Sequence, residues 1–198
     1  GLPPTEAELS QPATPENFAR VAEKLLASDA HAERWARHFM DIWRYCDWYG
    51  LGAQLRHSQK HIWHWRDWIV ESLNEDKPYD RMLAEMVAAD EIAPEDPDAL
   101  RATGFLVRNY KMLSREQWLE DTVKHTFQGF LGVTVGCAKC HDHMTDPISQ
   151  REYYAARAIF EPHQVRTDRI PGQLDTGKDG LARAYDSTNA PTYLLLRG

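Results

Sequence analysis

The chain has 198 residues, with 23 Lys and Arg against 30 Asp and Glu, so its formal net charge is −7. This length predicts one domain, or one domain with an appendage, and the acidic balance argues against a general nucleic-acid binder, which normally has a basic face. No apolar run reaches the roughly 18 residues of a membrane span. Because the chain lacks an initiating Met and ends in TYLLLRG, we expect a piece of a longer protein.

The first part of the chain has the start signals and apolar spacing of helices. Thr14 and Pro15 are typical of an N-cap and a first helical position. A second helix is expected from Ala30 to about Tyr49, and the stretch 49–52 would end it. Its predicted apolar stripe has steps of four, four and three residues and consists of Trp35, Phe39, Trp43 and Cys46. Six of the seven Trp lie between positions 35 and 68, which indicates either a bulky helical core or the wall of a flat apolar cofactor.

Four more helices follow in the next hundred residues. Apolar spacing predicts helices over Ile62–Leu73 and Tyr79–Ala89, and the acidic, Pro-containing stretch Asp90–Pro97 predicts an exposed loop. Capping-box patterns at Ser114 and at Ser149 open two further helices, the second of which runs to about Phe160.

After Pro162 the sequence becomes rich in Gly, Pro and Asp, and only Thr192–Leu196 has the composition of a short strand. We therefore expect a mainly α fold. Residues 1–162 would form an irregular helical domain. Residues 163–198 would form a loop-rich extension that leads into a following domain.

The most specific motif is the Cys-x-x-Cys-His sequence formed by Cys137, Cys140 and His141. This pattern is typical of c-type haem attachment. Two thiols separated by two residues can form thioethers with the two vinyl groups of one haem, and the His that follows can bind the iron. The motif predicts one covalently attached haem c, and we expect the irregular helical domain of residues 1–162 to form around it.

Three other interpretations of the cysteine pair are open. Cys137, Cys140 and His143 with a fourth ligand would make a zinc site in a structural interaction module, but no second pair of ligands has finger spacing. A thiol redox motif is the next alternative, although no β-α-β pattern precedes it. The last is a purely structural pair of buried cysteines.

The flanks of this motif resemble a known family. The segments LGVTVGCAKCHDH (131–143) and DPISQREYY (146–154) are similar to the planctomycete-type cytochrome c-like domain family, the second cytochrome-like domain of large proteins and a domain of unknown function. ERWARHF (33–39), NEDKPYD (74–80), ATGFL (102–106) and VRTDR (165–169) fit as well. The resemblance implies a position between an upstream cytochrome-like domain and a downstream domain. Met144 and Cys46 depart from the family pattern.

Candidates for a second iron ligand come from distant segments, because His143 and Met144 are too close to His141 to reach the opposite face of the haem. His38 lies on the Trp-rich helix and is the first choice, with a buried core histidine as the plain alternative; His125 and His163 follow. On the same helix, Arg34 and Arg37 could bind the haem propionates beside Trp35, or simply form a solvated basic face.

These features predict a monohaem electron-transfer domain. The alternative is a haem enzyme with an open or weakly held sixth site that acts on peroxide, oxygen or a carbohydrate. With one motif per chain, electrons would pass to a redox partner protein or a neighbouring haem domain, or through a homo-oligomer or array. Because bacteria attach haem c outside the cytoplasmic membrane, we expect a periplasmic or cell-surface location.

Overall fold

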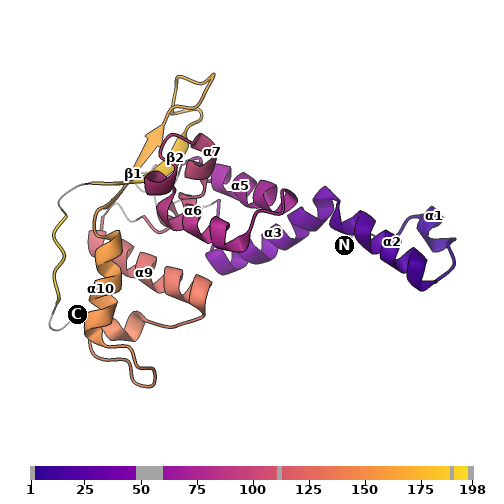
Figure 1. Cartoon of the computed structure of the whole chain (residues 1–198). Coiled ribbons are helices and arrows are strands. Elements are labelled where there is room, and N and C mark those ends of the chain that lie inside the picture. Colours follow the sequence, from indigo (N-terminus) through magenta and orange to yellow (C-terminus); the bar gives the residue numbers. More distant parts are fainter. Residues whose placement is uncertain (1–2, 48–59, 111–112, 188–189, 196–198) are drawn as a thin grey trace.

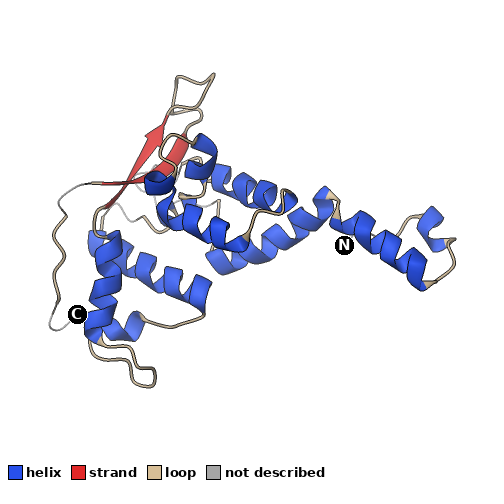
Figure 2. Ribbon diagram, in the orientation of Figure 1, coloured by secondary structure: helices blue, strands red, loops and turns tan. Residues whose placement is uncertain are grey.

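The computed structural model describes residues 3–47, 60–110, 113–187 and 190–195, and it is mainly helical with one small sheet, as expected (Figures 1 and 2). The helices and strands in chain order are α1 (Glu6–Leu9), α2 (Pro15–Leu26), α3 (Asp29–Trp43), α5 (Trp63–Asn74), α6 (Tyr79–Ile92), α7 (Pro97–Arg101), α8 (Gly104–Val107), α9 (Arg115–Leu131), the 3-10 turn η2 (Gly136–Lys139), α10 (Gln150–Phe160), β1 (His163–Asp168) and β2 (Leu181–Asp186).

The elements form an arm and a body. Helices α1 and α2 extend away from the body at the right of Figure 1, and neither contains a buried residue. In the body, α3 and α5 pack on each other, the sheet packs on α6, α7 and α8, and α9 packs on α10. Within the described part of the chain, no helix is both long and apolar enough to cross a membrane.

Tryptophans form the centre of the body. Trp43 from α3 and Trp65 and Trp68 from α5 are almost fully buried in the main hydrophobic core. Gly104, the first residue of α8, lies against Trp65, where a side chain would not fit. For these three tryptophans, the helical-core interpretation of the aromatic composition is therefore confirmed.

The predicted helix starts are confirmed by their caps. The side chain of Thr14 accepts a hydrogen bond from the Asn17 N–H at the start of α2, and Ser114 caps α9 in the same way. At α10, Ser149 and Glu152 form the complete reciprocal capping box. These caps satisfy N–H groups that have no partner within a helix.

The helix predicted from Ala30 to Tyr49 is shorter than expected. It ends at Trp43 because Arg44 takes a left-handed conformation with φ of 61°, and residues 49–52 lie outside the described residues. The predicted stripe is right only in part. Trp43 is buried and Phe39 packs against the core, as expected, but Trp35 is 51% exposed. Ala32 and Ala36 complete the buried face of α3 with Trp43. Ala36 and Ala32 precede Trp43 by seven and eleven residues, which places all three on one side at 3.6 residues per turn.

The loop predicted over Asp90–Pro97 is shorter than expected as well. Helix α6 continues to Ile92 after a kink at Ala88, whose φ is −148°. Helix α7 begins at Pro97, where the Asp98 N–H donates to the Asp96 side chain at 2.9 Å.

The strand predicted at Thr192–Leu196 is wrong. Residues 190–195 contain no strand, and Leu196 lies outside the described residues. The extension forms an antiparallel hairpin instead, with His163 opposite Asp186 and Asp168 opposite Leu181. Strands need hydrogen-bonding neighbours, and these two supply them to each other. Ala182 and Ala184 of β2 belong to the main core, so the body and the hairpin share one core across the predicted boundary at residue 162.

Candidate functional site

The first three residues of the Cys-x-x-Cys segment lie in the 3-10 turn η2, and the fourth, Cys140, is its C-cap. Because a 3-10 helix repeats every three residues, side chains three positions apart lie on the same side, and Cys137 and Cys140 have this spacing. Both cysteines are exposed free thiols, whereas Ala138 between them is fully buried. The turn therefore anchors its alanine in the core and presents both thiols outward on one face.

Helix α10 holds the backbone of this turn. The side-chain amide of Gln150 donates to the carbonyl oxygen of Lys139 at 3.0 Å, and the Tyr154 hydroxyl donates to the same oxygen at 3.2 Å. The main-chain N–H of Gln150 donates to Asp142 Oδ1 at 2.8 Å. The first turns of α10 therefore hold the chain on both sides of Cys140 and His141, at Lys139 and at Asp142.

The side chain of Lys139 connects the turn to α9. Its Nζ lies 2.9 Å from Glu120 Oε2 and 3.4 Å from Glu116 Oε1. Glu116 in turn accepts two hydrogen bonds, of 2.6 and 2.8 Å, from the Arg157 guanidinium of α10. These bonds from Arg157 lower the pKa of Glu116. Partial burial opposes the charge on Lys139, but its two carboxylate partners outweigh burial and raise its pKa.

His141 is exposed directly after the turn. Its Nδ1 lies 2.7 Å from the carbonyl oxygen of Asp142. Since a carbonyl can only accept, Nδ1 carries the proton and Nε2 carries the free lone pair. Metal-binding histidines commonly donate their second ring N–H to such a carbonyl, which fixes the tautomer and raises the basicity of the ligand atom. In the neutral ring, this hydrogen bond leaves His141 Nε2 as the atom available for a ligand bond.

His143 has a different role. Its Nδ1 accepts hydrogen bonds from the N–H groups of Asp146, at 3.0 Å, and Thr145, at 3.3 Å. This nitrogen therefore closes the loop after the motif. In the described residues, no three His, Cys, Asp or Glu side chains form a group that could hold a metal ion, so the alternative zinc site at Cys137, Cys140 and His143 has no support in their geometry.

The residues of the Trp-rich helix that were expected to contact the haem do not lie at the motif turn. Arg34, Trp35, Arg37 and His38 are exposed on α3, and the His38 and Trp35 rings meet edge to face with centroids 5.6 Å apart. Helix α3 packs on α2, α5 and α9, while η2 packs on α9 and α10 (Figure 1). The structure groups these four side chains on one helix and does not bring them to the turn.

The two other candidate ligands face carboxylates. His125 of α9 has its Nε2 3.8 Å from Asp121 Oδ1. His163 is buried at the start of β1, and its Nδ1 lies 3.3 Å from Asp186 Oδ1. Neither lies on the motif turn.

The residues that hold the turn were not found in the sequence. Gln150 and Tyr154 follow the motif within the predicted α10, and Glu116 and Glu120 lie four apart at the start of the predicted α9, on one side of that helix. These spacings were visible signals, but their pairing with Lys139 is a tertiary contact.

A family model described as PSCyt2, protein of unknown function (DUF1549), matches residues 1–165. The matched range includes the whole motif turn, α10 and the start of β1. No curated protein and no solved structure matches the chain.

Proposed function

The chain belongs to the PSCyt2 family, and on this premise we propose that it is a monohaem c-type cytochrome domain for electron transfer. Cys137 and Cys140 would hold the haem as two thioethers, and His141 would bind its iron through Nε2. When bound, the haem supplies an iron that changes between two oxidation states. One observation carries the proposal: an anchored turn presents both thiols on one exposed face and is followed by an imidazole in the ligand tautomer.

The chain's own contribution is pre-organisation of this turn. Ala138 is buried, and the Lys139 carbonyl accepts two hydrogen bonds from α10. Because the donor atoms are placed by such contacts, less conformational entropy is lost when they bind a group. The Asp142 carbonyl keeps the His141 ring oriented in the same way.

Covalent attachment is tested by extraction. The chain would be produced together with a c-type haem attachment system and treated with acid acetone, which removes haem that is not covalently bound. We expect the colour to stay with the protein and to be lost in Cys137→Ala/Cys140→Ala. Cys46→Ala is the matched control and should retain it. Colourless wild-type protein, or zinc without iron in metal analysis, would contradict the proposal.

His38 as the sixth ligand stays a prediction. If it holds, His38→Ala converts a low-spin haem to high-spin or opens the iron to carbon monoxide, without loss of attachment. His31→Ala, on the same helix, is the control. An unchanged low-spin spectrum would move the assignment to His125 or His163. A high-spin wild-type spectrum with fast ligand binding would favour the haem-enzyme alternative.

The setting of this activity is part of the proposal. Haem attachment of this kind places the protein outside the cytoplasmic membrane, in the periplasm or at the cell surface. One motif per chain requires electron exchange with a redox partner, with a neighbouring haem domain or with further copies of the chain.

A further inference from the structure

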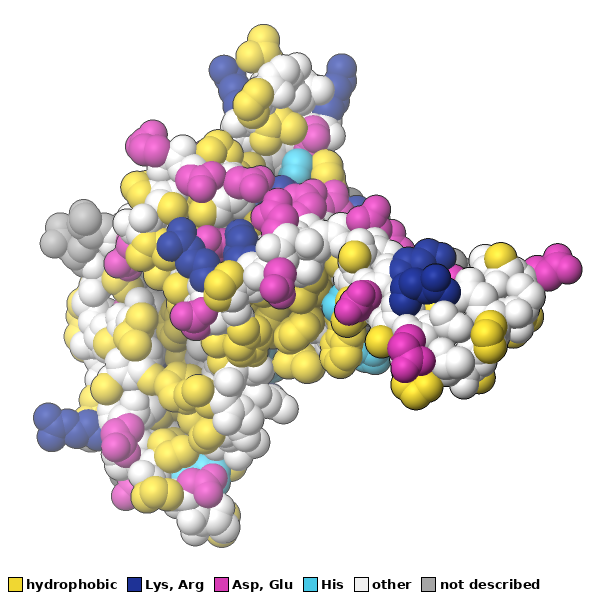
Figure 3. Space-filling model, turned by 45° about the vertical axis from the view of Figure 1, so that its right-hand side comes forward, with side chains coloured by type: hydrophobic (Ala, Val, Ile, Leu, Met, Phe, Trp, Pro, Cys, Tyr) yellow, Lys and Arg dark blue, Asp and Glu magenta, His cyan; other side chains and the backbone are white. Residues whose placement is uncertain are grey.

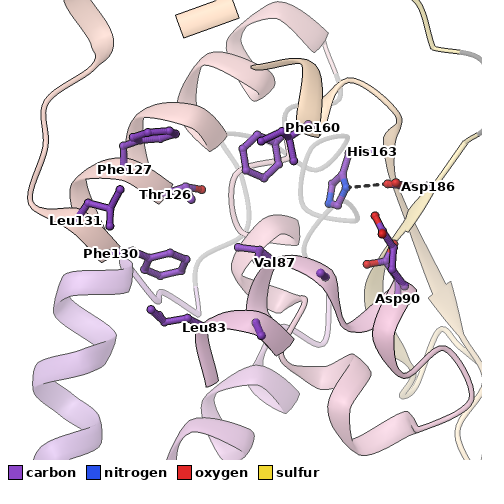
Figure 4. A pocket seen from close by; sticks show the side chains of 14 residues that line it. Leu83, Val87, Asp90, Thr126, Phe127, Phe130, Leu131, Phe160, His163 and Asp186 are labelled. Atoms are coloured by element: carbon purple, nitrogen blue, oxygen red, sulfur yellow. Dashed lines mark hydrogen bonds and ion pairs between the residues drawn. The ribbon is translucent and has the colours of Figure 1, made fainter. Parts of the chain in front are cut away.

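A hollow of about 520 Å³ lies between α6, α9, the end of α10 and the open end of the hairpin (Figure 4). Its walls are mainly apolar, with Val87 from α6, Phe127 and Phe130 from α9, and Phe160 from α10. This volume is in the range of small-molecule sites, roughly 300–1,000 Å³. None of these residues belongs to the motif turn, so Cys137, Cys140 and His141 lie outside the hollow.

One end of the hollow is acidic. Asp90 and Glu91 from the end of α6 and Asp186 from β2 line it together with His163, and no Lys or Arg is among the described residues that line it. In Figure 4 the His163 ring lies between Phe160 and Asp90, next to Asp186. Three carboxyl groups beside one imidazole favour a cation over an anion at this end.

The polar groups at this end have unused acceptor capacity. The Asp186 carboxylate can only accept, so His163 Nδ1 donates to it across 3.3 Å, and in the neutral ring this leaves Nε2 as an acceptor. Nε2 is buried and has no hydrogen-bond partner among the described residues. Burial also raises the pKa of Asp90, because its carboxylate has lost part of its hydration. Both groups would gain from a ligand that donates hydrogen bonds.

We propose that this hollow binds a small primary amine with an apolar body. The body would contact the Phe side chains, and the ammonium group would offer up to three hydrogen bonds to Asp90 and His163 Nε2. A neutral alcohol could serve only one of these acceptors. A carboxylate would be repelled by Asp90, Glu91 and Asp186.

Three probes with the same body and different charge test this selection. Isothermal titration of the full chain would compare 4-phenylbutylamine, 4-phenyl-1-butanol and 4-phenylbutanoate. We expect the amine to bind about tenfold more tightly than the alcohol, a difference of about 1.4 kcal/mol, and the carboxylate to bind most weakly. Equal affinity for the three probes, or no saturable binding of the amine, would overturn the proposal.

Charge variants test whether the acidic end of the hollow causes the preference for the amine over the alcohol. Asp90→Asn should weaken amine binding about tenfold and leave alcohol binding unchanged. Glu95→Gln, which removes the same charge from an exposed position outside the hollow, should change neither. Should Asp90→Asn fail to fold, Glu91→Gln takes its place, because Glu91 is exposed at the rim. Amine affinity that is unchanged in the folded variant would overturn the proposal.

Discussion

Lys139 connects the motif turn to α9 through ion pairs. Its side chain is 17% exposed and pairs with Glu120 and Glu116. Lys139→Gln should lower the free energy of unfolding by about 1 kcal/mol, a modest value because both partners are partly exposed. Haem attachment should persist, since the contacts from Gln150 and Tyr154 use the Lys139 backbone carbonyl. Urea unfolding measures the effect, with exposed Lys178→Gln as the control; equal midpoints in the two variants would contradict it.

Glu116 makes part of the stability depend on pH. The hydrogen bonds from Arg157 hold its pKa below the ordinary value of 4.5. A carboxyl group with a lowered folded-state pKa stabilises the fold above its unfolded pKa, and this contribution is lost as the pH falls through the folded value. Glu116→Gln should therefore weaken the loss of stability that wild type shows as the pH falls below 4.5.

Denaturant unfolding at neutral and acidic pH measures how much unfolding free energy wild type and Glu116→Gln each lose as the pH falls. Glu16→Gln removes the same charge from an exposed position on α2, and it should lose as much unfolding free energy on acidification as wild type does. A steeper acid loss in Glu116→Gln than in wild type would speak against the Arg157 pair.

The candidate haem-binding residues come from the sequence alone, whereas the residues that hold their backbone do not. Cys137, Cys140 and His141 lie within five consecutive positions, so their spacing alone predicts a shared chemistry. The hydrogen bond from His141 to the Asp142 carbonyl depends on a rotamer, and the contact between Lys139 and Glu116 spans 23 residues. Apolar spacing carries no signal for such pairs.

At the scale of elements, α8 and α5 meet through a glycine. A Cβ added at Gly104 would lie 2.3 Å from Trp65 Cβ, so the two helices would have to separate. Gly104→Ala should cost about 1–3 kcal/mol of unfolding free energy. Gly129→Ala is the matched control inside α9, where the nearest atom lies 3.6 Å away. It should stabilise the protein by about 0.5–1 kcal/mol, because alanine is the better helix former. Thermal unfolding that ranks the two variants in the opposite order would contradict this packing.

Helix starts were predictable because capping is local. Thr14, Ser114 and Ser149 bond to groups three residues away. The end of α3 depends on a left-handed Arg44, a conformation that no glycine marked in advance. The hairpin was missed because β2 lacks alternation, since its first four residues are all buried against α6, α7 and α8.

At the scale of the whole molecule, the arm contributes little to the core. Figure 3 shows hydrophobic side chains on the surface of the arm, and Phe18, Leu25 and Leu26 are more than half exposed. Deletion of residues 1–27 should therefore change the melting temperature of the body by only about 2 °C or less. Circular dichroism during heating measures it. A large drop would show that α2 packs on the body in solution.

The overall class was predictable because most of the chain has helical periodicity, whereas the placement of α3 relative to the motif turn was not. The Trp-rich helix was expected to face the haem, and its Arg34, Trp35, Arg37 and His38 are exposed on another part of the body. Packing between helices that are distant in the sequence determines this placement, and residue spacing in a single sequence does not predict such packing.

Covalent haem attachment is the central claim, and the intact mass of the denatured, alkylated chain tests it most directly. The 22.8 kDa chain has three cysteines. With Cys137 and Cys140 used as thioethers, the denatured protein should carry the added mass of one haem and one alkyl group, on Cys46. A chain with three alkyl groups and no haem, after production with the attachment system, would contradict the account.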